Sequence, residues 1–235
     1  MINFDNILLI DGAMGTSIQN LNLSSSDFGG DHLDGCNEYL NIINPNYIKD
    51  IHRSFIDVGA NIIETNSFGA TPIVLDEYKL SDLAEEINFK AAKIAKSSIN
   101  DSDNSILVAG SMGPTTKLLS LNQIKSADVT FDLLVQNYKI QARGLISGGS
   151  DFLLIETSQD ILNVKAAIQG IQLAKSDLNT NDIPFAINGG GDDKLIERLY
   201  WASIPHSTTH KNPDIYKKRN AKIVSCNTHA ITTAL

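Results

Sequence analysis

Carboxylate side chains that suit proton transfer or the binding of a positive charge stand directly behind two short apolar runs of this sequence. Asp11 follows the run at residues 7–10, and Glu156 follows the run at residues 152–155. Two carboxyl groups at one site can act as a general acid and a general base. Each also has a structural interpretation, because Asp11 precedes a glycine in a pair typical of turns and Glu156 could hydrogen-bond a neighbouring loop. The choice depends on whether the apolar runs are strands whose ends meet.

Other polar residues follow further apolar runs in the same relative position. Thr65 and Asn66 come directly after the run at residues 61–64, and they suit either contact with a ligand or hydrogen bonds that shape the floor of a site. Phe68 is a candidate for the wall of such a site or for packing beneath a helix. Ser111 follows the run at residues 106–109 and is expected to line the site through its backbone.

The cysteines and histidines offer one pattern with the spacing of a metal site. His206 and His210 form one pair, Cys226 and His229 form another, and the spacing within each pair suits zinc. The order is the reverse of a common zinc finger, and no hairpin or helix pattern frames the residues, so we interpret these histidines as solvated. Two cysteines, Cys36 and Cys226, are too few for a disulfide framework, which fits a reducing compartment and predicts a cytoplasmic protein.

The apolar runs read as parallel strands because they are brief and lack alternation of apolar and polar residues. We expect strands at residues 7–10, 61–64, 106–109, 152–155 and 183–187, separated by helical periodicity at 46–58, 83–99, 129–146 and 161–173. This order predicts a parallel α/β fold whose strand ends carry the site. The residues after the first strand, DGAMG, lack the glycine pattern of a dinucleotide-binding loop, which favours a (β/α)8 barrel over an open sheet.

Composition defines the limits of the domain and the classes of partner. A net charge of −8 gives the chain no general attraction for nucleic acid or anionic lipid, and no stretch is apolar enough to cross a membrane. Residues 21–44 are polar and irregular, as in a lid or a surface decoration. The strand–helix pattern is lost near Asn188, apart from a short helical run at 195–201 and a weak apolar run at Ile223. We therefore expect a barrel portion at 1–187 and an atypical tail at 188–235.

Five motifs, in order, resemble the homocysteine S-methyltransferase family, and within it the N-terminal homocysteine-binding domain of cobalamin-dependent methionine synthases. They are residues 11–16 (DGAMGT), 35–41 (GCNEYLN), 59–70 (GANIIETNSFGA), 109–115 (AGSMGPT) and 154–157 (LIET). The resemblance implies a barrel whose strand ends bind homocysteine, and a transfer of a methyl group to its thiol that gives methionine. The residues it assigns to substrate binding are Asp11, Thr65, Asn66, Phe68, Ser111 and Glu156.

The resemblance also implies cofactors and partners. Family members hold zinc with three cysteines, one from an Asn-Cys motif and two from a Gly-Gly-Cys-Cys motif, and zinc converts the substrate thiol to a thiolate. Neither motif is present here, and Cys36 matches a position that is not a zinc ligand. Methylcobalamin is expected only through another domain or chain, together with folate-binding domains absent from this sequence.

Two alternatives remain open from the sequence. In the first, residues after about Asn188 are not the family's own continuation, and the chain is a truncated, non-catalytic fragment that at most binds homocysteine; five strands do not close an eight-stranded barrel. In the second, a different barrel enzyme uses Asp11 and Glu156 as an acid–base pair.

Overall fold

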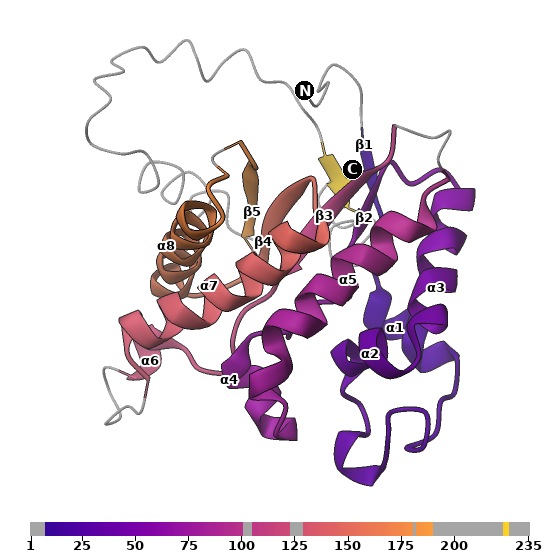
Figure 1. Cartoon of the computed structure of the whole chain (residues 1–235), viewed down its shortest axis with the longest axis horizontal. Helices are drawn as coiled ribbons and strands as arrows, with labels where there is room; N and C mark the ends of the chain where they lie inside the picture. Colours follow the sequence, from indigo (N-terminus) through magenta and orange to yellow (C-terminus); the bar gives the residue numbers. More distant parts are fainter. Residues whose placement is uncertain (1–7, 101–104, 123–128, 181, 190–222, 226–235) are drawn as a thin grey trace, which may run out of the picture.

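A curled parallel sheet forms the centre of the computed structural model, which describes residues 8–100, 105–122, 129–180, 182–189 and 223–225 (Figure 1). The strands stand in the order β5-β4-β3-β2-β1-β6. Their bounds are β1 Leu8–Ile10, β2 Ile62–Glu64, β3 Leu107–Met112, β4 Phe152–Ser158, β5 Phe185–Gly189 and β6 Ile223–Ser225. Each pair of neighbours is parallel. The first five strands follow the chain order, which is the succession of an incomplete (β/α)8 barrel.

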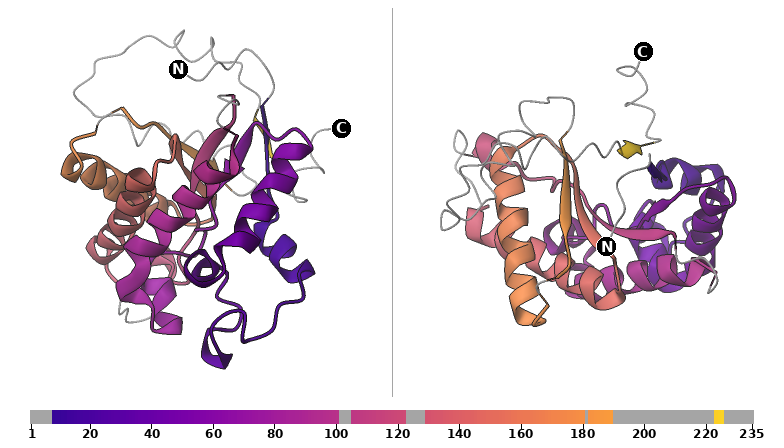
Figure 2. Two further views of the ribbon diagram at one scale, coloured as in Figure 1. Left: turned by 45° about the vertical axis from the view of Figure 1, so that its right-hand side comes forward. Right: turned by 90° about the horizontal axis from the view of Figure 1, so that it is seen from above.

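The long helices cover the outer side of the curled sheet (Figure 2). The helices are α1 Met14–Asn20, α2 Leu40–Ile43, α3 Pro45–Asp57, α4 Pro72–Leu75, α5 Ala84–Ser98, α6 Leu119–Asn122, α7 Phe131–Gly148 and α8 Ile161–Asp177. Helices α3, α5, α7 and α8 follow β1 to β4 in turn, so each connects two adjacent parallel strands. No helix in the described part of the chain is long and apolar enough to span a bilayer.

Capping residues set the ends of the two longest outer helices of the second half. Thr130 precedes α7, and its hydroxyl accepts a hydrogen bond from the backbone N–H of Leu133. Gly149 ends the same helix at φ +101°, a left-handed conformation that glycine adopts without a steric penalty. Asp160 precedes α8 and accepts from Leu162 N. Both starts therefore satisfy backbone donors that a helix leaves unpaired.

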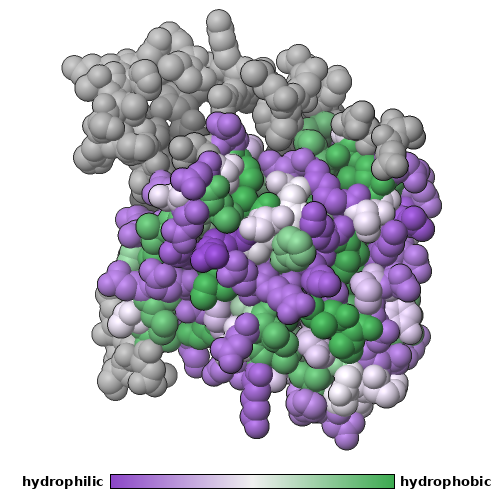
Figure 3. Space-filling model, viewed as in Figure 1, coloured by the Kyte–Doolittle hydropathy of each residue, from purple (hydrophilic) through white to green (hydrophobic). Residues whose placement is uncertain are grey.

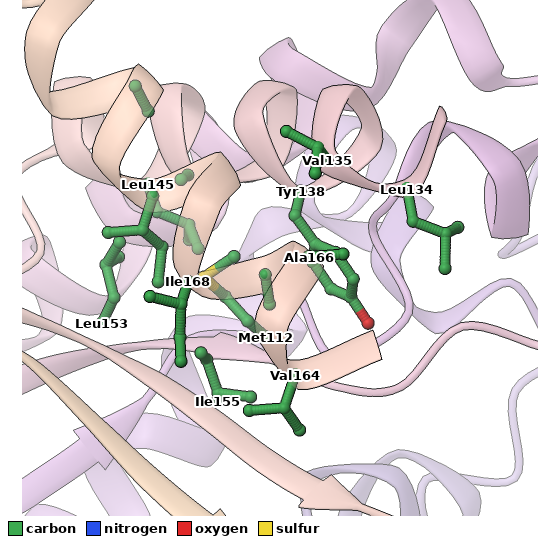
Figure 4. Packing of buried hydrophobic residues seen from close by; sticks show 14 of the residues in the cluster. Met112, Leu134, Val135, Tyr138, Leu145, Leu153, Ile155, Val164, Ala166 and Ile168 are labelled. Carbon is green, nitrogen blue, oxygen red and sulfur yellow. The ribbon is translucent and has the colours of Figure 1, made fainter. Parts of the chain in front are cut away.

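The largest apolar cluster lies between the sheet and helices α7 and α8 (Figure 4). Tyr138 and Leu145 of α7 pack there with Leu153 and Ile155 of β4, and all four are almost fully buried. Gly170 lets the helices approach closely, because a Cβ at this position would stand 2.8 Å from the carbonyl oxygen of Val135. On the surface seen in Figure 3, hydrophilic residues are interspersed with hydrophobic ones over the outer helices.

Two strands run further than the apolar runs indicate. β3 continues past Ala109 to Met112, and β4 continues past Ile155 to Ser158. Pairing explains both extensions. Met112 lies opposite Ile155 in an unbroken register with β4, and Ser158 pairs with Gly189 of β5 beyond an irregularity. Polar residues predicted to follow the strands are therefore partly inside them. The weak apolar run near residue 223 forms β6 beside β1, whereas the helical run at 195–201 lies outside the described residues.

The polar stretch at 21–44 is folded onto the rest of the domain. It contains two short 3₁₀ helices, η1 Asp31–Leu33 and η2 Asn37–Tyr39, and then α2. Phe28, Leu33 and Leu40 are buried in a cluster with residues of α1, α3 and α5. Apolar contacts with these helices fix the stretch, which a pattern of polar residues does not reveal.

Candidate functional site

Strand alternation brings polar side chains of three strands to one face. Ile62, Ala109 and Leu154 form an apolar cluster on the inner face of the curled sheet, opposite the outer helices. Successive side chains of a strand point to opposite faces, so the residue two positions later returns to the same face. That residue is Glu64 in β2, Ser111 in β3 and Glu156 in β4. The inner face therefore changes from apolar to polar at the carboxyl ends of the strands, the usual end for a barrel active site.

Asp11 joins this group from the end of β1. The residue is 3% exposed, and its Oδ1 accepts a hydrogen bond of 2.7 Å from the backbone N–H of Glu64. The carboxyl group thus connects the ends of two strands and does not cap its own turn. Burial, opposed by the Glu64 hydrogen bond and reinforced by the charge of Glu156, raises the pKa of Asp11 to about 8. At neutral pH this carboxyl group is mostly protonated.

Glu156 is held by hydroxyl groups. Its Oε1 accepts a hydrogen bond of 2.5 Å from Ser111 Oγ, and the Thr157 hydroxyl provides a second. Glu156 is 5% exposed, and burial raises its pKa although both hydrogen bonds lower it. Thr157 has φ +53°, a left-handed conformation that is costly for a β-branched residue. It stands beside an irregularity in the pairing of β4 with β5, so the strain is located at the site.

Glu64 is a member of the cluster that sequence reasoning left out of the predicted site. Burial is the main cause that raises the pKa of Glu64 well above its usual value, followed by the charges of Glu156 and Asp11. No other described residue donates a hydrogen bond to its carboxyl group. The alternation of side chains along β2 is the signal that places it on the inner face.

Thr65 and Asn66 shape the site and hold its surroundings together. Thr65 Oγ1 accepts from Ser111 N at 2.9 Å, and it shares a hydrogen bond with the Ser67 hydroxyl. Asn66 Nδ2 donates to the backbone oxygen of Asn37 and to the side chain of Asn41, which bonds the Asn66 backbone in return. These bonds tie residues 37–41 to the loop after β2. Through these bonds Thr65 and Asn66 have a structural role in the loop after β2.

Phe68 occupies the rim of this region. Its side chain is 42% exposed, and its ring and backbone oxygen lie against Gly113, where a Cβ would stand 2.7 Å from both. Gly113 N also donates to Phe68 O at 3.0 Å. The loop after β3 therefore rests directly on Phe68, and the exposed ring is available for contact with a bound molecule.

His52 is the second residue that sequence reasoning missed. It lies on α3, is fully buried, and its Nδ1 stands 4.0 Å from Asp11 Oδ2. Neither ring nitrogen has a hydrogen-bond partner among the described residues. Burial lowers the pKa of His52 to about 4, so the ring is neutral at physiological pH. The available signal was a polar residue next to Ile51 in the apolar stripe of that helix.

The described residues do not fit a zinc site. No group of three or more histidine, cysteine, aspartate and glutamate side chains comes close enough to hold a metal in the ranges that the structure describes. Cys36 is 1% exposed, and burial raises the pKa of its thiol to about 12. It packs against Ala70 and Leu75, away from the carboxyl cluster of Asp11, Glu64 and Glu156. His206, His210, Cys226 and His229 lie outside the described residues.

Comparison with known proteins gives this geometry a context. A model of the homocysteine S-methyltransferase family matches residues 8–204. Similar solved structures include the homocysteine methyltransferase MmuM from Escherichia coli in a metallated form, with 20% identity, a TM-score of 0.57, and coverage of 78% of this chain and 64% of that chain. The oxidised form has 20% identity, a TM-score of 0.56, and coverage of 77% of this chain and 61% of that chain. The apo form has 18% identity, a TM-score of 0.52, and coverage of 78% of this chain and 60% of that chain.

These structures share the fold, and the present chain spans about three fifths of their length. The predicted barrel type and the predicted family are confirmed.

Proposed function

This chain belongs to the homocysteine S-methyltransferase family, and from that membership we propose that its inner-face carboxyl groups bind homocysteine as the acceptor of a methyl group. The observation that carries the proposal is the meeting of Asp11 and Glu156 at the carboxyl ends of β1 and β4, buried and without a lysine or arginine partner among the described residues. A buried carboxylate needs a positive charge or hydrogen-bond donors. The ammonium group of an amino acid supplies both.

The remaining predicted residues support the ligand around this ammonium group. Ser111 fixes Glu156 by its hydroxyl and is itself fixed at the backbone by Thr65. Asn66 anchors the loop that carries Phe68, whose exposed ring is placed to contact the apolar part of the ligand. The protein thus orients the amino acid from its amino end, which determines where the thiol points.

The reaction that we propose transfers a methyl group to the homocysteine sulfur and yields methionine. The sulfur lone pair forms the new S–C bond, the donor keeps the electrons of the bond that breaks, and the thiol proton is lost. A thiol is mostly protonated at neutral pH, so an activating group is needed. Zinc would supply that activation in this family, but the described residues do not fit it, and Cys36 is a buried neutral thiol.

Within the family we propose the methionine-synthase type. The sequence motifs that resemble the N-terminal domain of cobalamin-dependent methionine synthases support this choice. Methylcobalamin and folate would then act through other domains or chains, and the product places the protein in methionine biosynthesis. Net charge and cysteine content support a cytoplasmic location.

Calorimetric titration with L-homocysteine tests the proposal. We expect Glu156→Gln to weaken binding by about 10–100-fold, since a charge-assisted hydrogen bond to the ammonium is lost. Glu86→Gln is the matched control, because Glu86 is exposed on α5 and outside the site. Absence of binding by the unaltered chain would contradict the proposal.

A transfer assay separates the proposed enzyme from the fragment alternative. The chain is incubated with homocysteine, zinc and either S-methylmethionine or methylcobalamin, and methionine is measured. Methionine formed by the chain and lost in Glu156→Gln supports catalysis. Binding without any methionine supports a non-catalytic domain that presents homocysteine.

A further inference from the structure

We propose that Glu64 is a third member of the ammonium site, and that the cluster of Asp11, Glu64 and Glu156 gives up a proton when the amino group of its ligand enters. This inference rests on the proposed function and deepens it, because it states how the empty site stays stable and what it selects. The ligand class is a free α-amino acid with a protonated amine. Glu64 is assigned to the site by its position and surroundings alone.

The three carboxyl groups occupy neighbouring positions at one edge of the sheet. Asp11 ends β1, Glu64 ends β2, and Glu156 is on the inner face of β4, with Ser111 of β3 between the last two. Asp11 Oδ1 is bonded to Glu64 N, and Glu156 Oε1 to Ser111 Oγ. The pKa of each carboxyl group is raised by burial, and like charges add to the effect at Asp11 and Glu64.

His52 is an independent sign that a group is missing from this cluster. It is fully buried on α3 with Nδ1 4.0 Å from Asp11 Oδ2, and both ring nitrogens lack hydrogen-bond partners in the described part of the chain. A buried polar atom without a partner needs an explanation, and beside a carboxyl cluster that lacks a cation an absent ligand provides one. The ring does not supply the charge itself, because burial lowers its pKa to about 4.

No cation in the described residues balances these carboxyl groups. The titratable groups that face one another are Asp11 from β1, His52 from α3, Glu64 from β2 and Glu156 from β4, while β3 contributes the uncharged hydroxyl of Ser111. The lysine and arginine side chains that form ion pairs pair elsewhere. Asp11 and Glu156 are buried and Glu64 is partly buried, so three unbalanced negative charges here are costly. Protons therefore neutralise part of the cluster in the free protein.

An entering ammonium group changes that balance. It brings one positive charge and three N–H donors, so a carboxyl group that was protonated can ionise against it. The O–H bond of that carboxyl group breaks, the electron pair stays on oxygen, and the proton passes to water. The ligand keeps all its own protons. A ligand that enters with a neutral amine would accept that proton itself, so the release of a proton to water reports the entry of a protonated amine.

The experiment is calorimetric titration of the whole chain with L-norleucine, which lacks a thiol and so contributes no thiol proton. Titration in buffers of different ionisation heat gives the number of protons released for each ligand bound. We expect release approaching one proton at pH 7 and a decline as the pH rises past about 8, where Asp11 of the free chain is ionised. Glu64→Gln should reduce the release by at least half and weaken binding about tenfold, while Glu86→Gln changes neither.

The outcomes are distinguishable. Binding of norleucine without proton release, or a Glu64→Gln variant identical to the parent, overturns the exchange and leaves the proposed function standing. Binding of neither norleucine nor homocysteine overturns both. Infrared difference spectroscopy of the parent chain makes the test independent of variant folding: the band of a protonated carboxylic acid should disappear on addition of norleucine, and its persistence overturns the proposal.

Discussion

Asp151 and Glu156 stand at opposite ends of the same strand, and their carboxyl groups have different surroundings. Asp151, directly before β4, lies 2.6–2.7 Å from Lys96 Nζ and accepts a hydrogen bond of 2.7 Å from Val108 N. Glu156 has hydroxyl donors and two carboxyl neighbours, Asp11 and Glu64, but no cation among the described residues. The carboxylate at the amino end of the sheet is paired with a cation, whereas the carboxyl groups at the carboxyl end have none among the described residues.

The difference separates two roles of charged side chains, a partly exposed ion pair at one end of the sheet and a carboxyl cluster at the other. A carboxylate with its cation and backbone donor fixes one strand against the next and contributes to stability. A group of carboxyls without a cation lowers stability in the free protein and keeps interaction energy available for a ligand. This division agrees with the rule that the carboxyl-terminal face of a barrel carries function and the amino-terminal face carries stability.

The largest expected effect comes from Asp11→Asn. The amide can still accept the hydrogen bond from Glu64 N, but it removes a carboxyl group whose pKa is raised by burial to about 8. A raised carboxyl pKa favours the folded state most below the unfolded value of 3.8, and this contribution is lost as the pH rises to about 8. Each unit by which the pKa is raised corresponds to about 1.4 kcal/mol, and relaxation of the cluster reduces the total. The free energy of unfolding of the variant should therefore rise by about 2–4 kcal/mol relative to the parent between pH 4 and pH 8.

Urea unfolding at a series of pH values measures this gain. His52 acts in the opposite direction, since its lowered pKa makes stability rise with pH between about 4 and its usual value of 6.5. Comparing parent and variant cancels that contribution. A stability difference that is the same at pH 4 and pH 8 would show that Asp11 titrates normally and that the carboxyl end is already balanced.

The sequence predicted the arrangement of elements well because parallel strands covered on both faces leave a strong pattern. The apolar runs became β1 to β5, and the periodic segments became α3, α5, α7 and α8. Asp11 and Glu156 follow apolar runs in the sequence, and both are buried at the carboxyl end of the sheet, where the charge of Glu156 acts on Asp11. The family motifs allowed residues to be assigned to substrate binding, which spacing alone does not permit.

The parts that were missed depend on contacts between distant segments. Glu64 becomes a member of the cluster through its neighbours Asp11 and Glu156, and His52 through a contact across β1 and α3. The fixed stretch at 21–44 depends on burial of Phe28 and on bonds from Asn66 to Asn37. Alternation in β2 and the apolar stripe of α3 indicate the faces of Glu64 and His52, but their partners belong to distant segments that only the assembled fold brings near.

A smaller effect is expected at the opposite end of the sheet. Asp151→Ala leaves Lys96 without its ion pair and Val108 N without its acceptor. We expect a loss of about 1–3 kcal/mol in the free energy of unfolding, with binding of homocysteine unchanged. Asp50→Ala is the control, because Asp50 is exposed on α3 and should change stability by less than about 0.5 kcal/mol. Weakened binding in Asp151→Ala would mean that the two ends are coupled.

The smallest effect concerns the strained residue beside Glu156. Thr157→Gly removes a left-handed β-branched residue and should stabilise the free chain by about 1 kcal/mol, while the loss of its hydroxyl from Glu156 weakens amino-acid binding several-fold. Lys79→Gly is the matched control, since Lys79 is exposed at φ +58°, so its replacement should stabilise similarly and leave binding unchanged. Urea unfolding and calorimetry of both variants decide the matter. If both glycine variants gain stability and both keep full affinity, then the strain at Thr157 serves the turn and not the ligand. If affinity falls only in Thr157→Gly, the conformation is maintained at a cost in stability because it directs a donor onto the carboxyl cluster.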